Sequence, residues 1–205
     1  MAAVGAVVLA GGRSSRMGRP KADLEWRGST LLGHTVDVVA RATGGPVVVV
    51  RAAGQQLPPL PPGVTVVDDS RPAAGPLQGI ADGLAAVHAT AAFVCSTDLP
   101  FLHPAFVRQV LDGLGDGDVA LPVVGGFRQP LAAAYRTALA VTAARLLAAG
   151  ASRPGALLDL CTVTLLDEAA LLADPELRRH DPELQSVVGV NDPSAYERAR
   201  ATGSA

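Results

Sequence analysis

The chain has 205 residues, of which 49% are hydrophobic and 18% are charged, and its formal net charge is −2. This composition is typical of one folded domain over 1–205 with a sizeable core, and it argues against intrinsic disorder. The near-neutral charge and the 3% aromatic content argue against nucleic-acid binding, which uses basic patches or stacking platforms.

Strand-like β-branched runs alternate with helix-like segments along the chain, which predicts an α/β fold with a mostly parallel sheet covered by helices. The expected strands are 4–9, 47–50, 64–67, 92–95, 119–124, 131–135, 163–166 and 187–190. The expected helices are 30–42, 77–88, 104–114, 138–149, 154–160 and 194–201, and 52–63 is expected to be a surface loop. The acidic stretch 167–183 is compatible with helix or with an irregular surface excursion.

The cysteines and the apolar runs bear on the compartment. Cys95 and Cys161 lie far apart with no CxxC spacing, so each is expected to be a small apolar residue rather than a ligand or half of a disulfide. No cation precedes the N-terminal apolar run, which we interpret as the first strand rather than a targeting segment. No apolar run approaches the ~20 residues that span a bilayer, so we expect a cytoplasmic protein without membrane contact.

A glycine- and arginine-rich loop follows the first strand and ends at Lys21 (LAGGRSSRMGRPK). Glycines allow backbone N–H groups to approach an anion closely, and the cations can neutralise it. The last glycine, Gly18, is not followed by the Lys and Ser/Thr of a Walker loop, and its spacing from Gly11 and Gly12 does not fit a dinucleotide fingerprint. The loop therefore predicts a nucleoside triphosphate site that is neither a Walker loop nor a dinucleotide-binding loop.

Oxygen ligands follow other predicted strands. Asp69 comes after 64–67, Asp98 lies in CSTDLP after 92–95, and Asn191 follows 187–190. Ligands of open parallel sheets bind at the carboxyl ends of strands, and Mg²⁺ takes oxygen ligands together with substrate phosphates. No G-x-S-x-G elbow occurs in the sequence, so a reaction without a protein nucleophile, such as phosphoryl or nucleotidyl transfer, is favoured.

The motifs LAGGRSSRMGRPK, GPLQGI, CSTDLPF, RQPLAAAYR and VND occur in the order found in molybdenum cofactor guanylyltransferases, and the chain resembles this family over almost its whole length. The resemblance implies a Rossmann-like three-layer nucleotidyltransferase fold. In that fold we expect an NTP-binding half at about 1–102 and an acceptor half at about 103–205.

The resemblance also implies an activity. The phosphate of molybdopterin-bound molybdenum would attack the α-phosphorus of GTP with the help of Mg²⁺, giving the guanine dinucleotide cofactor and pyrophosphate. Molybdenum-insertion proteins or acceptor molybdoenzymes are the implied protein partners. The implied nucleotide-binding residues are Leu9, Ala10, Gly11, Gly12, Lys21, Asp69 and Asp98, the implied catalytic residues are Lys21, Arg16 and Asp98, and the implied metal ligands are Asp98 and Asn191.

The chain departs from the family pattern at a few positions. Pro20 replaces the aspartate usual in guanylyl members, and no asparagine occurs in Arg51–Ala53 after the second strand, where it is usual. Pro20 is more common in cytidylyl relatives, so a cytidylyltransferase for the same cofactor or a sugar-1-phosphate nucleotidyltransferase is an alternative. A further alternative is a catalytically inactive, nucleotide-binding regulatory protein, because only Arg153 keeps the charge of the pterin-side segment.

Overall fold

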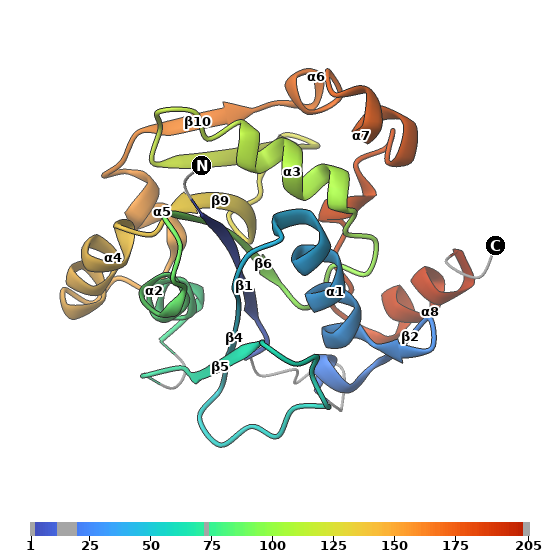
Figure 1. The fold of residues 1–205 in the computed structure, drawn as a ribbon, viewed down its shortest axis with the longest axis horizontal. Helices are drawn as coiled ribbons and strands as arrows, with labels where there is room; N and C mark the ends of the chain where they lie inside the picture. Colours follow the sequence, from blue (N-terminus) through green and yellow to red (C-terminus); the bar gives the residue numbers. More distant parts are fainter. Residues whose placement is uncertain (1–2, 12–19, 72–73, 203–205) are drawn as a thin grey trace.

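The computed structural model describes residues 3–11, 20–71 and 74–202 (Figure 1). In these residues the main sheet has eight strands in the order β10-β7-β9-β6-β1-β4-β5, with β8 paired to β7. The strands of this sheet are β1 (Val4–Leu9), β4 (Val47–Arg51), β5 (Thr65–Asp68), β6 (Ala91–Ser96), β7 (Val119–Val124), β8 (Phe127–Arg128), β9 (Ala132–Arg136) and β10 (Val163–Leu166).

The centre of the sheet is parallel. Strand β1 pairs in parallel with β4 on one side and with β6 on the other, and β4 pairs in parallel with β5. The valines of β4 are buried, as expected for a strand covered on both faces. Strand β9 runs antiparallel to both β6 and β7, which makes the sheet mixed but mostly parallel, as predicted. The carboxyl ends of β1, β4, β5 and β6 therefore share one edge.

Helices cover both faces of the sheet and make the predicted three-layer arrangement (Figure 1). Helices α1 (Leu31–Thr43) and α3 (Pro104–Asp112) pack on one face, and α2 (Pro76–Ala86), α4 (Leu139–Ala148) and α5 (Pro154–Leu158) pack on the other. The other helical segments are η1 (Lys21–Asp23), α6 (Glu168–Leu171), α7 (Pro175–His180), η2 (Gln185–Val187) and α8 (Pro193–Thr202). None of the helices in the described ranges has the length and apolarity needed to cross a bilayer.

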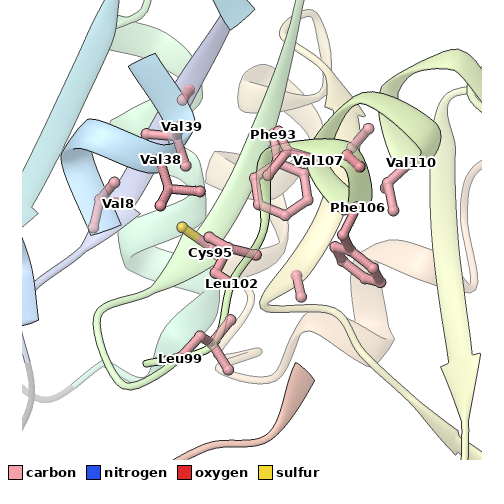
Figure 2. Packing of buried hydrophobic residues seen from close by; sticks show 14 of the residues in the cluster. Val8, Val38, Val39, Phe93, Cys95, Leu99, Leu102, Phe106, Val107 and Val110 are labelled. Carbon is pink, nitrogen blue, oxygen red and sulfur yellow. The ribbon is translucent and has the colours of Figure 1, made fainter. Parts of the chain in front are cut away.

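The core beneath α1 and α3 is built from small aliphatic side chains around one aromatic contact (Figure 2). Phe93 of β6 and Phe106 of α3 meet edge to face with ring centroids 6.4 Å apart. Cys95 is fully buried in this core, as predicted, and burial raises the pKa of its thiol far above the usual range. Both Cys95 and the half-buried Cys161 are free thiols.

The prediction of a last strand at 187–190 is wrong. This segment begins at the last residue of η2, and the chain here is fixed by bonds that a strand would not make. The backbone N–H groups of Gln185 and Ser186 donate to the carboxylate of Asp181, and the N–H of Val190 donates to the carbonyl of Asp98 at 2.9 Å. The apolar run therefore lies along the loop after β6 instead of extending the sheet. The ambiguous stretch 167–183 contains the short helices α6 and α7.

A small hairpin, which the sequence analysis did not predict, follows Lys21. Its strands are β2 (Glu25–Trp26) and β3 (Ser29–Thr30), and its turn places Arg27 and Gly28 at φ angles of 50° and 78°. Positive φ at both central residues is the geometry of a type I′ hairpin turn, which glycine favours. The hairpin packs against α8, where the hydroxyl of Tyr196 donates to the carbonyl of Glu25.

Candidate functional site

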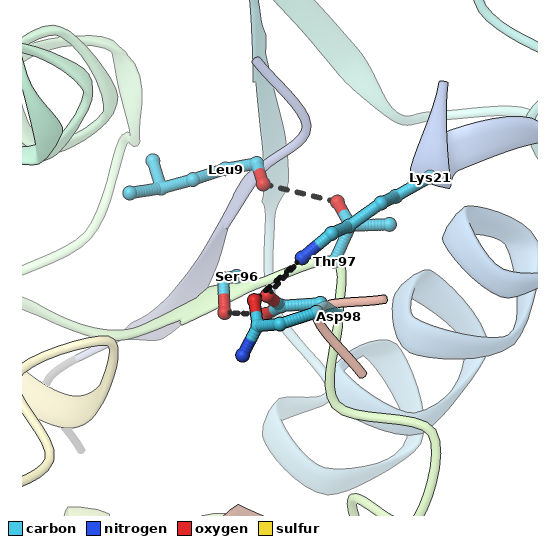
Figure 3. A network of polar contacts seen from close by, with 6 residues as sticks. Leu9, Lys21, Ser96, Thr97 and Asp98 are labelled. Carbon is cyan, nitrogen blue, oxygen red and sulfur yellow. Dashed lines mark hydrogen bonds and ion pairs between the residues drawn. The ribbon is translucent and has the colours of Figure 1, made fainter. Parts of the chain in front are cut away.

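Lys21 and Asp98 meet at the carboxyl edge of the sheet, although 77 positions separate them in the sequence (Figure 3). The ammonium nitrogen Nζ of Lys21 lies 2.7 Å from Oδ2 of Asp98 and 2.8 Å from Oδ1 of Asn191. The side chains of Lys21 and Asp98 are 20% and 19% exposed, so the pair is accessible but shielded on most sides. The structure thus brings together three of the residues that the sequence selected.

The position of Asp98 follows from the end of β6. Thr97 donates to the carbonyl of Leu9 through its backbone N–H at 3.2 Å and through its hydroxyl at 3.0 Å, which ties this loop to β1 (Figure 3). The hydroxyl of Ser96 donates to Oδ1 of Asp98. The side chain of His103, and not that of Asp98, caps the following helix α3. Asp98 therefore presents its carboxylate to the edge.

The position of Lys21 follows from the turn of η1. Its carbonyl accepts the N–H of Leu24 at 3.2 Å, and the carbonyl of Leu24 accepts the N–H of Leu31 at 2.7 Å. The backbone of Lys21 is thus anchored to α1, while its long side chain reaches toward Asp98. Lys21 is also the only lysine of the chain, since every other residue among the 17 Lys and Arg is arginine.

The end of β1 carries three predicted nucleotide-binding residues, Leu9, Ala10 and Gly11. The N–H groups of Ala10 and Gly11 both donate to the carbonyl of Val50, at 2.8 and 3.2 Å. A Cβ on Gly11 would come within 2.9 Å of the backbone nitrogen of Ala52, so no larger residue fits at this position. Glycine therefore allows the chain after β1 to lie close to the chain after β4, and its N–H is used in a hydrogen bond to β4.

Gln55, which the sequence analysis did not select, supports this strand end. Its Nε2 donates to the carbonyl of Ala10 at 3.1 Å, and its Oε1 accepts the N–H of Ala52 at 3.0 Å. The side chain therefore joins the loop after β4 to the end of β1. No spacing or motif in the sequence signals this contact, because it depends on how the loop 52–63 folds back.

Asp69 lies at the end of β5, further along the same edge. Its N–H donates to the carbonyl of Arg51 at 2.7 Å, and its Oδ1 accepts the N–H of Arg71 at 3.0 Å, which is ordinary turn geometry. Burial raises the pKa of the Asp69 carboxyl, and the neighbouring Asp82 carboxylate adds to this rise, against the Arg71 N–H bond. Its neighbour Asp68 is half exposed and pairs with Arg51 at 2.7 Å. The nucleotide-binding role of Asp69 stays a prediction.

Two further predicted site residues, Gly12 and Arg16, lie outside the residues that the structure describes. The predicted contribution of the arginine-rich loop therefore rests on the sequence alone.

The oxygens around the Lys21 ammonium fit a hard cation. Asp98 contributes a carboxylate and Asn191 an amide carbonyl, and both already face a positive charge. Within the described ranges no three His, Cys, Asp or Glu side chains gather into a metal cluster. Mg²⁺ commonly uses one or two protein carboxylates together with waters and substrate phosphates, so this sparse donor set suits a metal that arrives with a phosphate ligand.

The chain is similar to known proteins in sequence and in fold. The family described as "MobA-like NTP transferase domain" matches residues 6–169. The chain is 41% identical over 160 residues to the "Probable molybdenum cofactor guanylyltransferase" of Mycobacterium tuberculosis (strain ATCC 25618 / H37Rv), covering 75% of this chain and 78% of that protein.

Two solved structures share the fold. The molybdopterin-guanine dinucleotide biosynthesis protein A of Archaeoglobus fulgidus superposes with a TM-score of 0.75 at 21% identity, covering 98% of each chain. Rv0371C of Mycobacterium tuberculosis H37Rv in complex with manganese superposes with a TM-score of 0.59 at 23% identity, covering 80% of this chain and 87% of that one.

Proposed function

Because this chain belongs to the family of MobA-like NTP transferase domains and is a nucleotidyltransferase of molybdenum cofactor processing, we propose that it transfers GMP from GTP to the phosphate of the molybdenum-molybdopterin cofactor. The products are the molybdopterin guanine dinucleotide cofactor and pyrophosphate. The observation that carries the proposal is the pairing of Lys21 with Asp98 at the shared carboxyl edge of β1 and β6. The M. tuberculosis relative, whose name states guanylyl transfer, supports the choice of GTP.

The reaction joins two anions. An oxygen of the acceptor phosphate forms a bond to the α-phosphorus of GTP, and the bond between the α-phosphorus and the bridging oxygen breaks as pyrophosphate leaves. No protein nucleophile or strong base is required, so positioning and charge neutralisation provide most of the catalysis. We assign the cationic contribution to Lys21, together with Arg16 of the loop, and we assign the nucleotide contacts to Leu9–Gly12 and Asp69.

We further propose that Asp98 and Asn191 hold Mg²⁺. One oxygen of each already contacts the ammonium of Lys21, and a hard divalent cation binds the same kinds of oxygen ligand. A bound metal supplies neutralisation of the triphosphate charge. Rv0371C, which has a similar fold, is known in complex with manganese, and this supports the choice of a divalent cation.

In this proposal, the acceptor substrate binds to the half of the chain that does not bind the nucleotide. Residues 1–102 carry the nucleotide side, and residues 103–205 carry the side that receives the molybdopterin substrate. Molybdenum-insertion proteins or acceptor molybdoenzymes are the proposed protein partners, because the cofactor must be delivered and passed on.

Pro20 directly before Lys21 favours a second candidate, a cytidylyltransferase for the same cofactor. A thermal-unfolding screen of GTP, CTP, ATP and UTP, each with Mg²⁺, separates the two. We expect GTP to stabilise the protein most, by about 2.7 kcal/mol at 100 times its dissociation constant. Greater stabilisation by CTP would replace the guanylyl proposal with the cytidylyl one, and stabilisation by none of the four would remove both.

Gln55→Ala is expected to raise KM for GTP about fivefold with little change in kcat, since each lost hydrogen bond contributes about 1 kcal/mol. The reason is that Gln55 fixes the Ala10 carbonyl and the Ala52 N–H beside the proposed nucleotide. Steady-state kinetics of guanylyl transfer measure the effect, and Gln56→Ala, at the exposed neighbouring position, is the matched control. Equal KM values for the two variants would contradict the proposed role of Gln55 in fixing the nucleotide site.

A further inference from the structure

The ammonium of Lys21 occupies the position that the proposed metal needs. Nζ lies 2.7 Å from Oδ2 of Asp98 (Figure 3). It also lies 2.8 Å from Oδ1 of Asn191. The other carboxylate oxygen of Asp98 accepts the hydroxyl of Ser96. Both oxygens of Asp98 are therefore engaged within the chain itself, and the charge of the carboxylate is balanced by the cation of Lys21.

A metal and the ammonium cannot share this contact. Mg²⁺ binds oxygen at 2.0–2.1 Å, so a divalent charge on Oδ2 of Asp98 would stand next to a positive charge that already contacts the same atom. At such distances, in a partly shielded site, like charges repel strongly. Lys21 must therefore leave Asp98 before the carboxylate can accept the metal.

Lys21 is built to move without disturbing the fold. Its backbone is held by the bond from Leu24 N–H to its carbonyl, at 3.2 Å, while four rotatable carbons separate that backbone from the ammonium. Asp98 stays in place when Lys21 leaves, because two other contacts hold it. The hydroxyl of Ser96 donates to its carboxylate, and the N–H of Val190 donates to its backbone carbonyl. Rotation of the Lys21 side chain can thus break the contact while the backbone stays anchored.

We propose that Lys21 is an exchangeable counter-ion of Asp98, released when the triphosphate binds. The anionic nucleotide attracts the ammonium away, and the freed carboxylate then accepts the divalent cation. Metal alone consequently binds weakly, whereas metal and nucleotide bind with positive coupling, and each strengthens the other by the same factor. The inference rests on the proposed nucleotide and metal site, but it holds for any nucleoside triphosphate.

The test uses Mn²⁺ alone as the probe, with free Mn²⁺ measured by electron paramagnetic resonance. We expect Lys21→Met to bind Mn²⁺ at least about tenfold more tightly than the wild-type protein, because a competing charge is removed. The double variant Lys21→Met/Asp98→Asn should lose this gain. Arg108→Met is the matched control, since it frees the carboxylate of Glu176 from a surface ion pair of 2.6 Å and should bind Mn²⁺ like wild type.

Two outcomes of the Mn²⁺ titration would overturn the exchange. One is a Lys21→Met affinity no higher than that of wild type, and the other is a gain that persists in the double variant, which would place the new site elsewhere. Lys21→Gln, also neutral, is measured in parallel, and the thermal unfolding of each variant verifies that it is folded.

The unmodified protein gives an independent measurement, because Lys21 is its only lysine. Protein carrying ¹⁵N only at lysine Nζ shows one side-chain resonance, that of Lys21. We expect Mg²⁺ alone to leave this resonance in place and Mg²⁺ with a non-hydrolysable GTP analogue to shift it. A resonance that does not respond to nucleotide would also overturn the exchange. Guanylyl transfer is assayed separately, so active enzyme without exchange, or exchange without transfer, identifies which of the two proposals fails.

Discussion

Lys21→Met is expected to reduce guanylyl transfer by at least about 100-fold and to weaken GTP binding, as found when a positioned charge-stabilising group is removed from other active sites. Lys21 is the only lysine of the chain, and its ammonium is held at the edge where β1 and β6 end. Removing it leaves two anionic substrates without this positive charge. Initial rates with molybdenum-loaded acceptor and calorimetric titration of GTP measure the two effects.

Lys21→Arg is the informative companion of this variant. A guanidinium keeps the charge but is planar and cannot replace a compact ammonium between two oxygens 2.7 and 2.8 Å away. We expect part of the GTP affinity to return and the transfer rate to remain well below that of wild type. Wild-type turnover in Lys21→Met, with the fold intact, would contradict the assignment of Lys21.

Asp98→Asn is expected to lower kcat about 1000-fold, which is the upper end of the effect of losing one electrostatic contact. The dissociation constant of GTP should change by less than about tenfold. The amide keeps the shape of the side chain and its bond with Ser96, but it removes the charge that holds either the ammonium or the proposed metal. The separation of kcat from binding distinguishes a role in the reaction from a role in nucleotide capture.

Asp68→Asn is the matched control for this prediction. Asp68 also lies at a strand end and also forms an ion pair of 2.7 Å, but it is half exposed and its partner is Arg51 rather than Lys21. Loss of an exposed pair changes stability by about 0–1 kcal/mol, so this variant should transfer GMP normally. Undiminished transfer by Asp98→Asn, or an equal loss in Asp68→Asn, would be incompatible with the role of Asp98.

The sequence predicted the layers and the central strands well because burial on both faces leaves a local signature. The valine run of β4 and the apolar β1 are such cases, and both pair in parallel as expected. The antiparallel direction of β9 has no such signature, since its alanines are compatible with either direction. The segment 187–190 has the composition of a strand, yet it lies outside the sheet. The N–H of Val190 bonds to the carbonyl of Asp98, and the two residues before the segment bond to the carboxylate of Asp181.

The candidate site was predictable to the extent that it depends on sheet topology. Strand ends of a parallel sheet meet at one edge, so the proximity of Asp98 to the end of β1 could be expected. The contact between Asn191 and Lys21 depends instead on the path of irregular chain after η2, and the Gln55 bridge depends on the fold of a long loop. Such contacts are set by tertiary structure and have no fixed spacing in the sequence.

The hairpin and α8 have a consequence for how the protein loses activity on heating. They form a satellite cluster, separate from the two cores that flank the sheet, from Leu24, Trp26, Leu31, Val190, Tyr196 and Ala199. Small units of this kind open at a lower free energy than the whole domain. Their opening would separate Asn191 from Lys21 while the sheet stays folded. We therefore expect inactivation to precede global unfolding on heating, with this corner of the molecule, rather than its large cores, setting the upper working temperature.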